Sequence, residues 1–402
     1  MLARSSSRFG LAFVLLATSA CDAPSGEFSV RDSAGVEVVE SRQPVWSADE
    51  AWRVGEPTVT IGTSLEGGMG QQLDRVVAAT RLSDGTIVIA DAGARALLRY
   101  DASGRYLGST GRAGDGPGEF RALNWVGKTA GDSLLTWDRG LGRVSVFTAS
   151  GELARQYLPS LTELPMSLEV KGQLSGGRLV LARGAGLVSR EGSPGVQRQP
   201  ITAWLISATG EEMQPFGPLP GETVFLDASQ AFMPVPLGAV TLFAARDDAV
   251  YVVDTETFAA SVFDHDGALS GIVRRHYPRR AIEPEDVEAD IDARMAELPS
   301  NLRNRDAYRR RFQGVPLPER LPAVRAVHVD TENHLWLEEV GAAGETSASW
   351  SVFDRDGRWL GDVRIPGSLT MLEIGPDYIL GREQDELDVH RVVLLPLERR
   401  TP

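Results

Sequence analysis

One motif recurs along the chain with a fixed internal spacing, and it constrains the fold more than any other feature. In its three clearest copies an Asp begins the motif and an aromatic residue stands next to its last position; these copies are residues 91–101, 138–148 and 254–264. An apolar run precedes each Asp, and a Gly closes a turn soon after each copy. This order of features is typical of consecutive antiparallel strands: an apolar run, a short break, a segment of alternating polarity and a turn at a Gly. The chain therefore predicts a series of β-meanders.

Weaker copies at 178–210, 335–357 and 376–397 raise the number of units to six. Six four-stranded meanders arranged radially form a propeller, a fold that exposes few strand edges. We therefore expect an all-β fold, a six-bladed β-propeller of four-stranded antiparallel blades, over residues 57–399. The last unit has only three clear strands, so we expect Thr58–Ile61 to supply its fourth strand and close the ring.

Two stretches of the first unit carry a family resemblance. Leu82–Asp91, followed by the glycine-rich Gly111–Phe120, resembles NHL-type repeats and the related six-bladed propeller lipoproteins of bacteria. The resemblance is strongest over residues 74–160. It implies the fold rather than an activity, because propellers host unrelated functions.

The N-terminus has the features of an export signal. Residues 1–20 contain Arg4 and Arg8, then an apolar run too short to span a bilayer, then small residues before Cys21. This stretch resembles a bacterial lipoprotein signal, in which the Cys is lipidated and becomes the new N-terminus; an ordinary signal peptide with a chance Cys is the alternative. We expect a lipidated tether and entry segment at 21–56. The protein would then be anchored to the inner or outer membrane of the cell envelope, with the propeller in the periplasm.

Composition excludes several other classes. Cys21 is the only cysteine, so the chain forms no intramolecular disulfide and no cysteine-based zinc site. A net charge of −14 provides no overall positive field for a phosphate backbone, which argues against nucleic acid as a partner. Only Lys128 and Lys171 are lysines among the basic residues, which we interpret as compositional bias.

The lengths of the connections predict a functional face. In an antiparallel four-stranded blade, the first and third turns lie on one face, and the second turn and the connection to the next blade lie on the other. The first set is short throughout, whereas the second set contains every long connection: 111–121, 183–200, 217–238, 278–321 and 340–347. Long loops gathered on one face of a rigid scaffold are common binding sites. Neutral drift of surface loops is the alternative.

Residues 278–321 contain the only convincing helical pattern and predict a helical hairpin inserted between blades 4 and 5. Glu283-Pro-Glu-Asp286 suits a helix start, and apolar residues follow at intervals of about one turn. The second half carries five arginines: Arg303, Arg305, Arg309, Arg310 and Arg311. Either they pair with the acidic first half, or they hold a carboxylate, a phosphate or an acidic partner.

Candidate ligand-binding residues are few. The repeat places an Asp at equivalent corners of three blades, where a ring of carboxylates could bind Ca²⁺ or make structural contacts instead. No cofactor is otherwise indicated. The candidate set comprises Asp91, Arg112, Asp138, Arg139, Asp254, Arg303, Arg309 and Arg310.

Catalytic motifs are missing from the sequence: it contains neither G-x-S-x-G nor H-E-x-x-H, and its five histidines are scattered. His328 lies in an alternating segment and could face a central channel. Glu169, Asn124 and Asp330 keep open a similarity to calcium-dependent lactonase propellers. We therefore expect a module that binds or scaffolds an unidentified envelope protein or small ligand through its long-loop face. The alternative is a metal-dependent hydrolase or lactonase-like enzyme with a site in the central channel.

The anchor makes a direct prediction. Growing cells with a labelled fatty acid should label the wild-type protein, and Cys21→Ala should abolish the label because that thiol is the attachment point. Label retained by the Cys21→Ala protein would contradict lipidation at this residue.

Overall fold

Strands dominate the structure, as the repeat predicts. The computed structural model describes residues 28–47, 49–62, 70, 72–160, 168–183, 193–228, 232–296, 298, 303–385 and 389–400. Cys21 and the expected signal peptide lie outside these residues. Within them the strands form sheets of four to six members, almost all antiparallel, an arrangement consistent with a β-propeller.

The first three sheets follow one another along the chain, and neighbouring strands are hydrogen-bonded in sequence order. The first sheet contains β5 (Val76–Arg81), β6 (Ile87–Asp91), β7 (Ala96–Tyr100) and β8 (Tyr106–Thr110). The second contains β9 (Leu123–Lys128), β10 (Leu134–Asp138), β11 (Arg143–Phe147) and β12 (Leu153–Tyr157). The third contains β13 (Leu168–Leu174), β14 (Arg178–Arg183), β15 (Gly195–Ile206), β16 (Met213–Leu226) and β17 (Phe232–Pro234).

The other three sheets continue this order, and two of them recruit strands from the N-terminal segment. The fourth contains β18 (Thr241–Arg246), β19 (Ala249–Asp254), β20 (Ala259–Phe263) and β21 (Leu269–Arg275), extended by β2 (Val36–Ser41) and β1 (Phe28–Ser33). The fifth contains β22 (Val324–Val329), β23 (Leu335–Glu339), β24 (Ser347–Phe353) and β25 (Trp359–Pro366). The last contains β26 (Thr370–Ile374), β27 (Tyr378–Gln384) and β28 (His390–Glu398), joined by β3 (Arg53–Val54) and β4 (Val59–Ile61).

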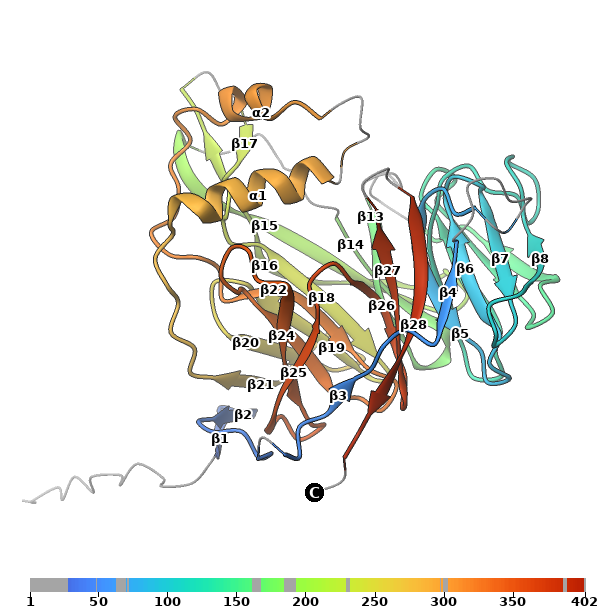
Figure 1. Ribbon diagram of the computed structural model, residues 1–402, viewed down its shortest axis with the longest axis horizontal. Coiled ribbons are helices and arrows are strands. Elements are labelled where there is room, and N and C mark those ends of the chain that lie inside the picture. The colour runs from blue at the N-terminus through green and yellow to red at the C-terminus, as the bar shows by residue number, and fades with distance from the viewer. Residues whose placement is uncertain are drawn as a thin grey trace, which may run out of the picture.

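The first strands of the sheets surround a common axis. Strand β5 contacts β9, β9 contacts β13, β13 contacts β18, β18 contacts β22, and β26 contacts β5. The remaining junction is bridged where the Thr331 amide donates to the Ile374 carbonyl at 2.9 Å. Figure 1 accordingly shows the sheet of β5 beside that of β26–β28, although these segments lie far apart in the sequence. The sheets thus close into a ring.

The hydrophobic core is divided among the junctions between successive sheets. In β6, Val88 and Ala90 pack against the second sheet, whereas Ile87 and Ile89 pack against the last sheet. Neighbouring residues of a strand face opposite sides, so a strand covered on both faces becomes apolar throughout. All five residues of β6 are buried for this reason.

The N-terminal segment is more ordered than the expected tether. Residues 28–41 form the β1–β2 hairpin, and β2 runs parallel to β21 along the outer edge of the fourth sheet. Further on, the Val45 and Trp46 amides donate to the Trp359 and Leu360 carbonyls at the start of β25. Strand β4 then pairs antiparallel with β28. The prediction that Thr58–Ile61 supplies the missing strand of the last unit is confirmed.

A buried ion pair joins the C-terminus to the same closure. The Asp330 carboxylate is fully buried, and it accepts hydrogen bonds from Arg399 at 2.9 Å, from the Trp336 indole at 3.0 Å and from His334. Arg399 also donates to the Gly375 carbonyl at 2.6 Å and lies 4.4 Å from the centre of the Trp52 ring. Desolvation opposes ionisation of Asp330, but the His334 hydrogen bond and the Arg399 charge outweigh it and lower the pKa of the carboxyl.

Parts of two expected long loops are strands, and residues 184–192 and 229–231 of these loops lie outside the described residues. We expected loops at 183–200 and 217–238, but β15 and β16 continue and pair with each other from Gly195↔Leu226 to Ile206↔Met213. The expectation was wrong because each segment provides the hydrogen-bonding partner of the other, which satisfies the backbone groups of both. Strand β17 pairs with the outer end of β16.

The helical pattern of 278–321 corresponds to α1 (Pro284–Ala296) and α2 (Arg305–Arg311), which lie between β21 and β22. Both helices gather with β17 at one end of the molecule (Figure 1). We call α1, α2, β17 and the paired ends Gly195–Arg198 and Thr223–Leu226 the lobe. In the described residues no helix combines the length and apolar character needed to cross a membrane.

Removing Arg399 tests the closure. Arg399→Met leaves the buried Asp330 carboxylate without its cation, which should lower the free energy of unfolding by about 3–5 kcal/mol. The exposed neighbour Arg400 is the matched control, and Arg400→Met should change stability by about 0.5 kcal/mol or less. Denaturant unfolding measures both. Equal effects of the two substitutions would contradict a stabilising role for the Arg399–Asp330 pair.

Candidate functional site

A cavity of about 610 Å³ occupies the axis of the ring. Its wall comes from the C-terminal halves of β5, β9, β13, β18, β22 and β26 and from the short turns that follow several of them, which include Thr129, Ser175 and Asp247. These turns belong to the face opposite the long connections. Sequence reasoning put its first expectation on the long-connection face and only its alternative in a central channel; His328, which could face such a channel, does line this cavity.

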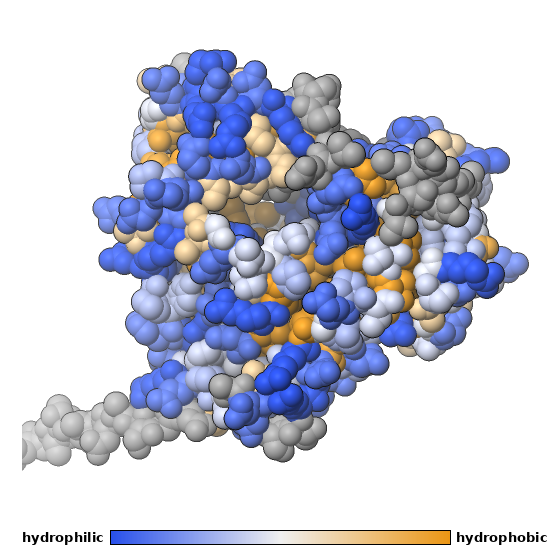
Figure 2. Space-filling view, viewed as in Figure 1, coloured by the Kyte–Doolittle hydropathy of each residue, from blue (hydrophilic) through white to orange (hydrophobic). Residues whose placement is uncertain are grey.

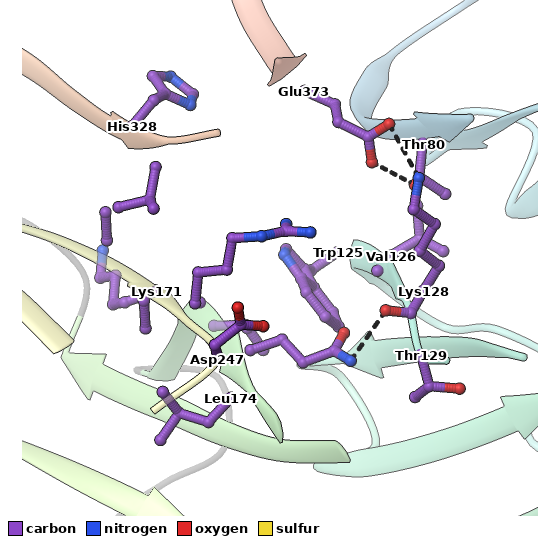
Figure 3. Close-up of a pocket in the computed structure, with 18 of the residues that line it drawn as sticks. Thr80, Trp125, Val126, Lys128, Thr129, Lys171, Leu174, Asp247, His328 and Glu373 are labelled. Atoms are coloured by element: carbon purple, nitrogen blue, oxygen red, sulfur yellow. Dashed lines mark hydrogen bonds and ion pairs between the residues drawn. The ribbon is translucent and has the colours of Figure 1, made fainter. Parts of the chain in front are cut away.

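Both lysines of the chain line this cavity. Lys128 ends β9 and Lys171 lies in β13, and Arg246 at the end of β18 adds a third cation. Figure 3 shows Lys128 on one side with Glu373 and Thr80, Lys171 on the other side with His328, and Trp125 between them. The compositional interpretation did not foresee that both lysines would line one cavity.

Glu373 in β26 neutralises Lys128. The carboxylate accepts from the lysine ammonium at 3.3 Å, from the Thr80 hydroxyl at 2.5 Å, from the Arg81 amide at 3.1 Å and from the Tyr378 hydroxyl. Burial, reinforced by the Glu373 charge, raises the pKa of Tyr378 far above its usual value, so this hydroxyl stays a donor. These contacts bind β26 to β5 and β9, and we assign Glu373 a structural role.

The other two cations are less completely neutralised. Within the described part of the chain, Lys171 forms one ion pair, with Glu169 at 2.7 Å. Arg246 has no ion pair or side-chain hydrogen bond to any residue that the structure describes, and its Nε is a buried donor without an acceptor. Asp247, the other acidic residue of the wall, accepts a hydrogen bond from Asn333 at 2.8 Å.

Trp125 and His328 give the cavity wall an uncharged surface. A Cβ on Gly127 would lie 2.4 Å from Trp125 and 2.6 Å from Gln173 Oε1, so only glycine leaves room for the Trp125 indole against β9. Burial lowers the pKa of His328 to about 4, which keeps its imidazole neutral near pH 7. The His328 ring lies 5.7 Å from that of Trp350.

The predicted ring of carboxylates makes structural contacts. Asp91 is fully buried and accepts from the backbone amides of residues 74, 75, 93 and 94 at 2.9–3.2 Å. Asp138 accepts in the same way from residues 121, 122, 140 and 141. Each carboxylate therefore joins two segments: the connection that enters its own sheet from the preceding sheet, and the turn that directly follows the Asp. Among the described residues, no three His, Cys, Asp or Glu side chains converge as metal ligands would.

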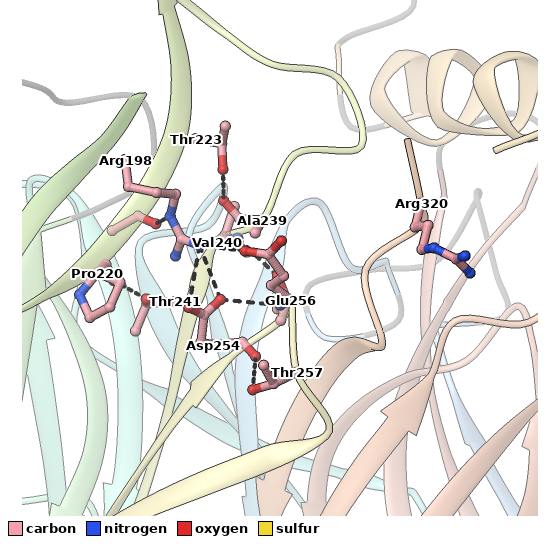
Figure 4. A network of polar contacts seen from close by, with 12 residues as sticks. Arg198, Pro220, Thr223, Ala239, Val240, Thr241, Asp254, Glu256, Thr257 and Arg320 are labelled. Atoms are coloured by element: carbon pink, nitrogen blue, oxygen red, sulfur yellow. Dashed lines mark hydrogen bonds and ion pairs between the residues drawn. The ribbon is translucent and has the colours of Figure 1, made fainter. Parts of the chain in front are cut away.

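Asp254 departs from this pattern because its main partner is an arginine. Arg198 donates to it at 3.1 Å and to the Gly221 carbonyl at 2.8 Å, and lies 3.8 Å from Glu256 (Figure 4). Glu256 is also 3.4 Å from Arg279, which donates to the Leu321 carbonyl at 2.7 Å. This network joins the base of the lobe to the fourth sheet.

The predicted arginines are spread over separate places. Arg112 pairs with Glu119 within its own loop at 2.8 Å, and Arg139 lies at the corner after β10. Arg303 donates to the carbonyls of Met295 and Leu298 at the end of α1. Arg309 pairs with Glu288 of α1 at 2.5 Å, whereas Arg310 is exposed. The two helices thus pair much of their opposite charge, and ligand binding by these arginines stays a prediction.

The residues that suggested a lactonase-like site are also engaged elsewhere. Glu169 pairs with Lys171, and Asp330 with Arg399. Asn124 lies in β9. The structure gives these three residues no common partner among the described side chains.

Comparisons with known proteins complete the description. No family model matches the chain, and no curated protein matches it. Solved structures similar to it include a member of the DUF4221 family from Bacteroides vulgatus (TM-score 0.49, 10% identity, 87% of this chain and 99% of that one). Others are the virginiamycin B lyase of Staphylococcus aureus (0.43, 12%, 87% and 100%) and a gluconolactonase from Xanthomonas campestris (0.41, 14%, 87% and 98%). At these scores the similarities carry no conclusion about the chemistry of this chain.

His328 generates a pH prediction. Its folded pKa lies below the unfolded value, so between about pH 6.5 and 4 the unfolded chain binds more protons. Stability should fall on acidification in this window, by at most about 1.4 kcal/mol per pH unit. His328→Gln should flatten this part of the profile in denaturant unfolding, whereas His265→Gln, at an exposed turn residue, should not. An unchanged profile for His328→Gln would contradict a buried, neutral His328.

Proposed function

We propose that this protein is a six-bladed β-propeller of the bacterial envelope, anchored to a membrane through lipidated Cys21, that acts as a binding module through its lobe. The helices would be an insertion between blades 4 and 5. The observation that carries the proposal is the lobe itself. Long connections from two different sheets gather on one face and are attached to the ring by ion pairs.

The attachments of the lobe support a rigid binding surface. Arg280 pairs with the buried Asp286 at the start of α1, at 2.5 Å, and also donates to the Gly341 carbonyl at 3.2 Å. The Arg198–Asp254 pair holds the base of the β-strand part (Figure 4). Surface loops that vary by neutral drift would not need these ion pairs to the ring. Ordered connections on a rigid scaffold are common recognition elements.

The exposed side of the lobe favours an acidic partner. Arg310 and Arg311 are exposed on α2. In α1, Glu288 is already paired with Arg305 and Arg309, and Asp292 is paired with Arg305. A hollow lies beneath the lobe in the space-filling view, between the helices and the sheets (Figure 2). The rival function is a metal-dependent hydrolase with its site in the central channel, where no group of three His, Cys, Asp or Glu side chains is found among the described residues.

Crosslinking followed by affinity purification from the protein's own envelope tests the lobe. The anchored wild-type protein should retain a defined partner, and Arg310→Glu with Arg311→Glu should lose it because the charge facing the partner is reversed. Arg355→Glu, at an exposed turn on the opposite face, is the matched control and should retain the partner. Identical partners for wild type and the lobe variant, or no specific partner, would contradict the proposal.

A further inference from the structure

We infer that the axial cavity is a binding site for a small organic anion, a carboxylate or phosphate attached to a flat or ring-shaped body. The cavity lies on the face opposite the lobe, so this inference does not depend on the proposed function. Its volume of about 610 Å³ falls within the ~300–1,000 Å³ typical of small-molecule sites.

Charge is the first argument. The chain is acidic overall, with a net charge of −14, yet three cations face one cavity: Lys128, Lys171 and Arg246. A chain with only two lysines places both of them here. Glu373 neutralises Lys128, and Asp247 is the other acidic residue of the wall. Glu169 pairs with Lys171 at 2.7 Å, so three carboxylates balance the three cations, and Arg246 is the cation that has no ion pair with any described residue. A bound anion would nevertheless meet three cationic side chains in a protein whose overall charge repels anions.

Arg246 is the second argument. A guanidinium removed from water is costly unless an anion or acceptor pairs with it. Arg246 is half-buried; its Nε is shielded from solvent and has no acceptor among the described residues. The Nε atoms of Arg275 and Arg399 also lack an acceptor, but the terminal nitrogens of these two guanidinium groups pair with Glu339 and Asp330. An anionic ligand would supply the missing acceptor.

The neutral part of the wall indicates what the anion is attached to. The Trp125 indole stands between the two sides of the cavity (Figure 3), where it offers a flat face for stacking. His328 is neutral, so it can donate or accept one hydrogen bond without adding charge. A cavity built only for an inorganic ion would need neither the aromatic surface nor this volume.

The Glu169–Lys171 pair allows a test with opposite signs. At 2.7 Å, Glu169 competes with a bound anion for the Lys171 ammonium. Removal of the Glu169 charge should therefore strengthen binding, whereas removal of the Arg246 charge should weaken it. Damage to the fold cannot produce a gain in affinity, so the two variants separate recognition from stability.

Isothermal titration with 2-naphthoate and 2-naphthyl phosphate tests the inference, with uncharged 2-naphthol as the reference. We expect saturable 1:1 binding of at least one anion, weaker by at least tenfold in Arg246→Gln and severalfold tighter in Glu169→Gln. The more tightly bound probe identifies the preferred anionic group. Arg105→Gln, an exposed arginine on the outer edge, should leave affinity unchanged.

Three results would overturn the inference. One is the absence of binding by both anions at millimolar concentration. Another is binding of 2-naphthol as tight as that of the anions. The third is an affinity that neither Arg246→Gln nor Glu169→Gln changes. If Arg246→Gln does not fold, Glu169→Gln alone decides, because an unchanged or weaker affinity in that variant contradicts competition for Lys171.

Discussion

Closure of the ring by segments from both ends of the chain is the interaction on which the rest of the structure depends. Strand β4, near the N-terminus, pairs with β28, near the C-terminus, and Arg399 reaches the buried Asp330 of the fifth sheet. Trp52 from the N-terminal segment covers the same guanidinium. The sheets pack through apolar junctions that are continuous around the axis, so an open ring would expose the junction between the first and last sheets.

The closed ring determines where function can be located. Six inner strands approach the axis closely enough to enclose a cavity, and the contacts of Glu373 with Thr80 and Lys128 hold three of them in register. The opposite face is left to the long connections, which form the lobe. A rigid ring therefore offers two separate surfaces: a small cavity lined by three cationic side chains, and a larger lobe with exposed arginines.

Local sequence signals predicted the fold well. The Asp that begins each repeat marks a real corner, because Asp91 and Asp138 hold equivalent sets of backbone amides. The missing strand at Thr58–Ile61 also followed from counting strands. The same signals did not predict the β1–β2 hairpin at residues 28–41 or its pairing with β21. A strand added to the edge of a sheet depends on a partner that is distant in the sequence, so the local pattern of 28–41 does not reveal it.

The candidate site could not be predicted in this way. Thr80 and Glu373, which touch in the cavity wall, are 293 residues apart, and no local pattern links them. Lysine scarcity was visible in the sequence, but only the fold brings Lys128 and Lys171 to one axis. The pairing of α2 arginines with α1 was one of two alternatives in the sequence, and the structure shows it for Arg305 and Arg309, which both contact Glu288.

Disulfide trapping across the closure tests the central claim most directly. In a Cys21→Ser background, Val59→Cys and Leu394→Cys place two thiols opposite each other on β4 and β28, within the Cα separation that a disulfide spans. Leu395→Cys in place of Leu394→Cys is the control, because adjacent strand residues face opposite sides. The account predicts rapid, near-complete crosslinking of the 59–394 pair and little of the 59–395 pair, measured by mass spectrometry of peptides. Equal crosslinking of both pairs, or none of the first, would contradict a ring closed by β4 and β28.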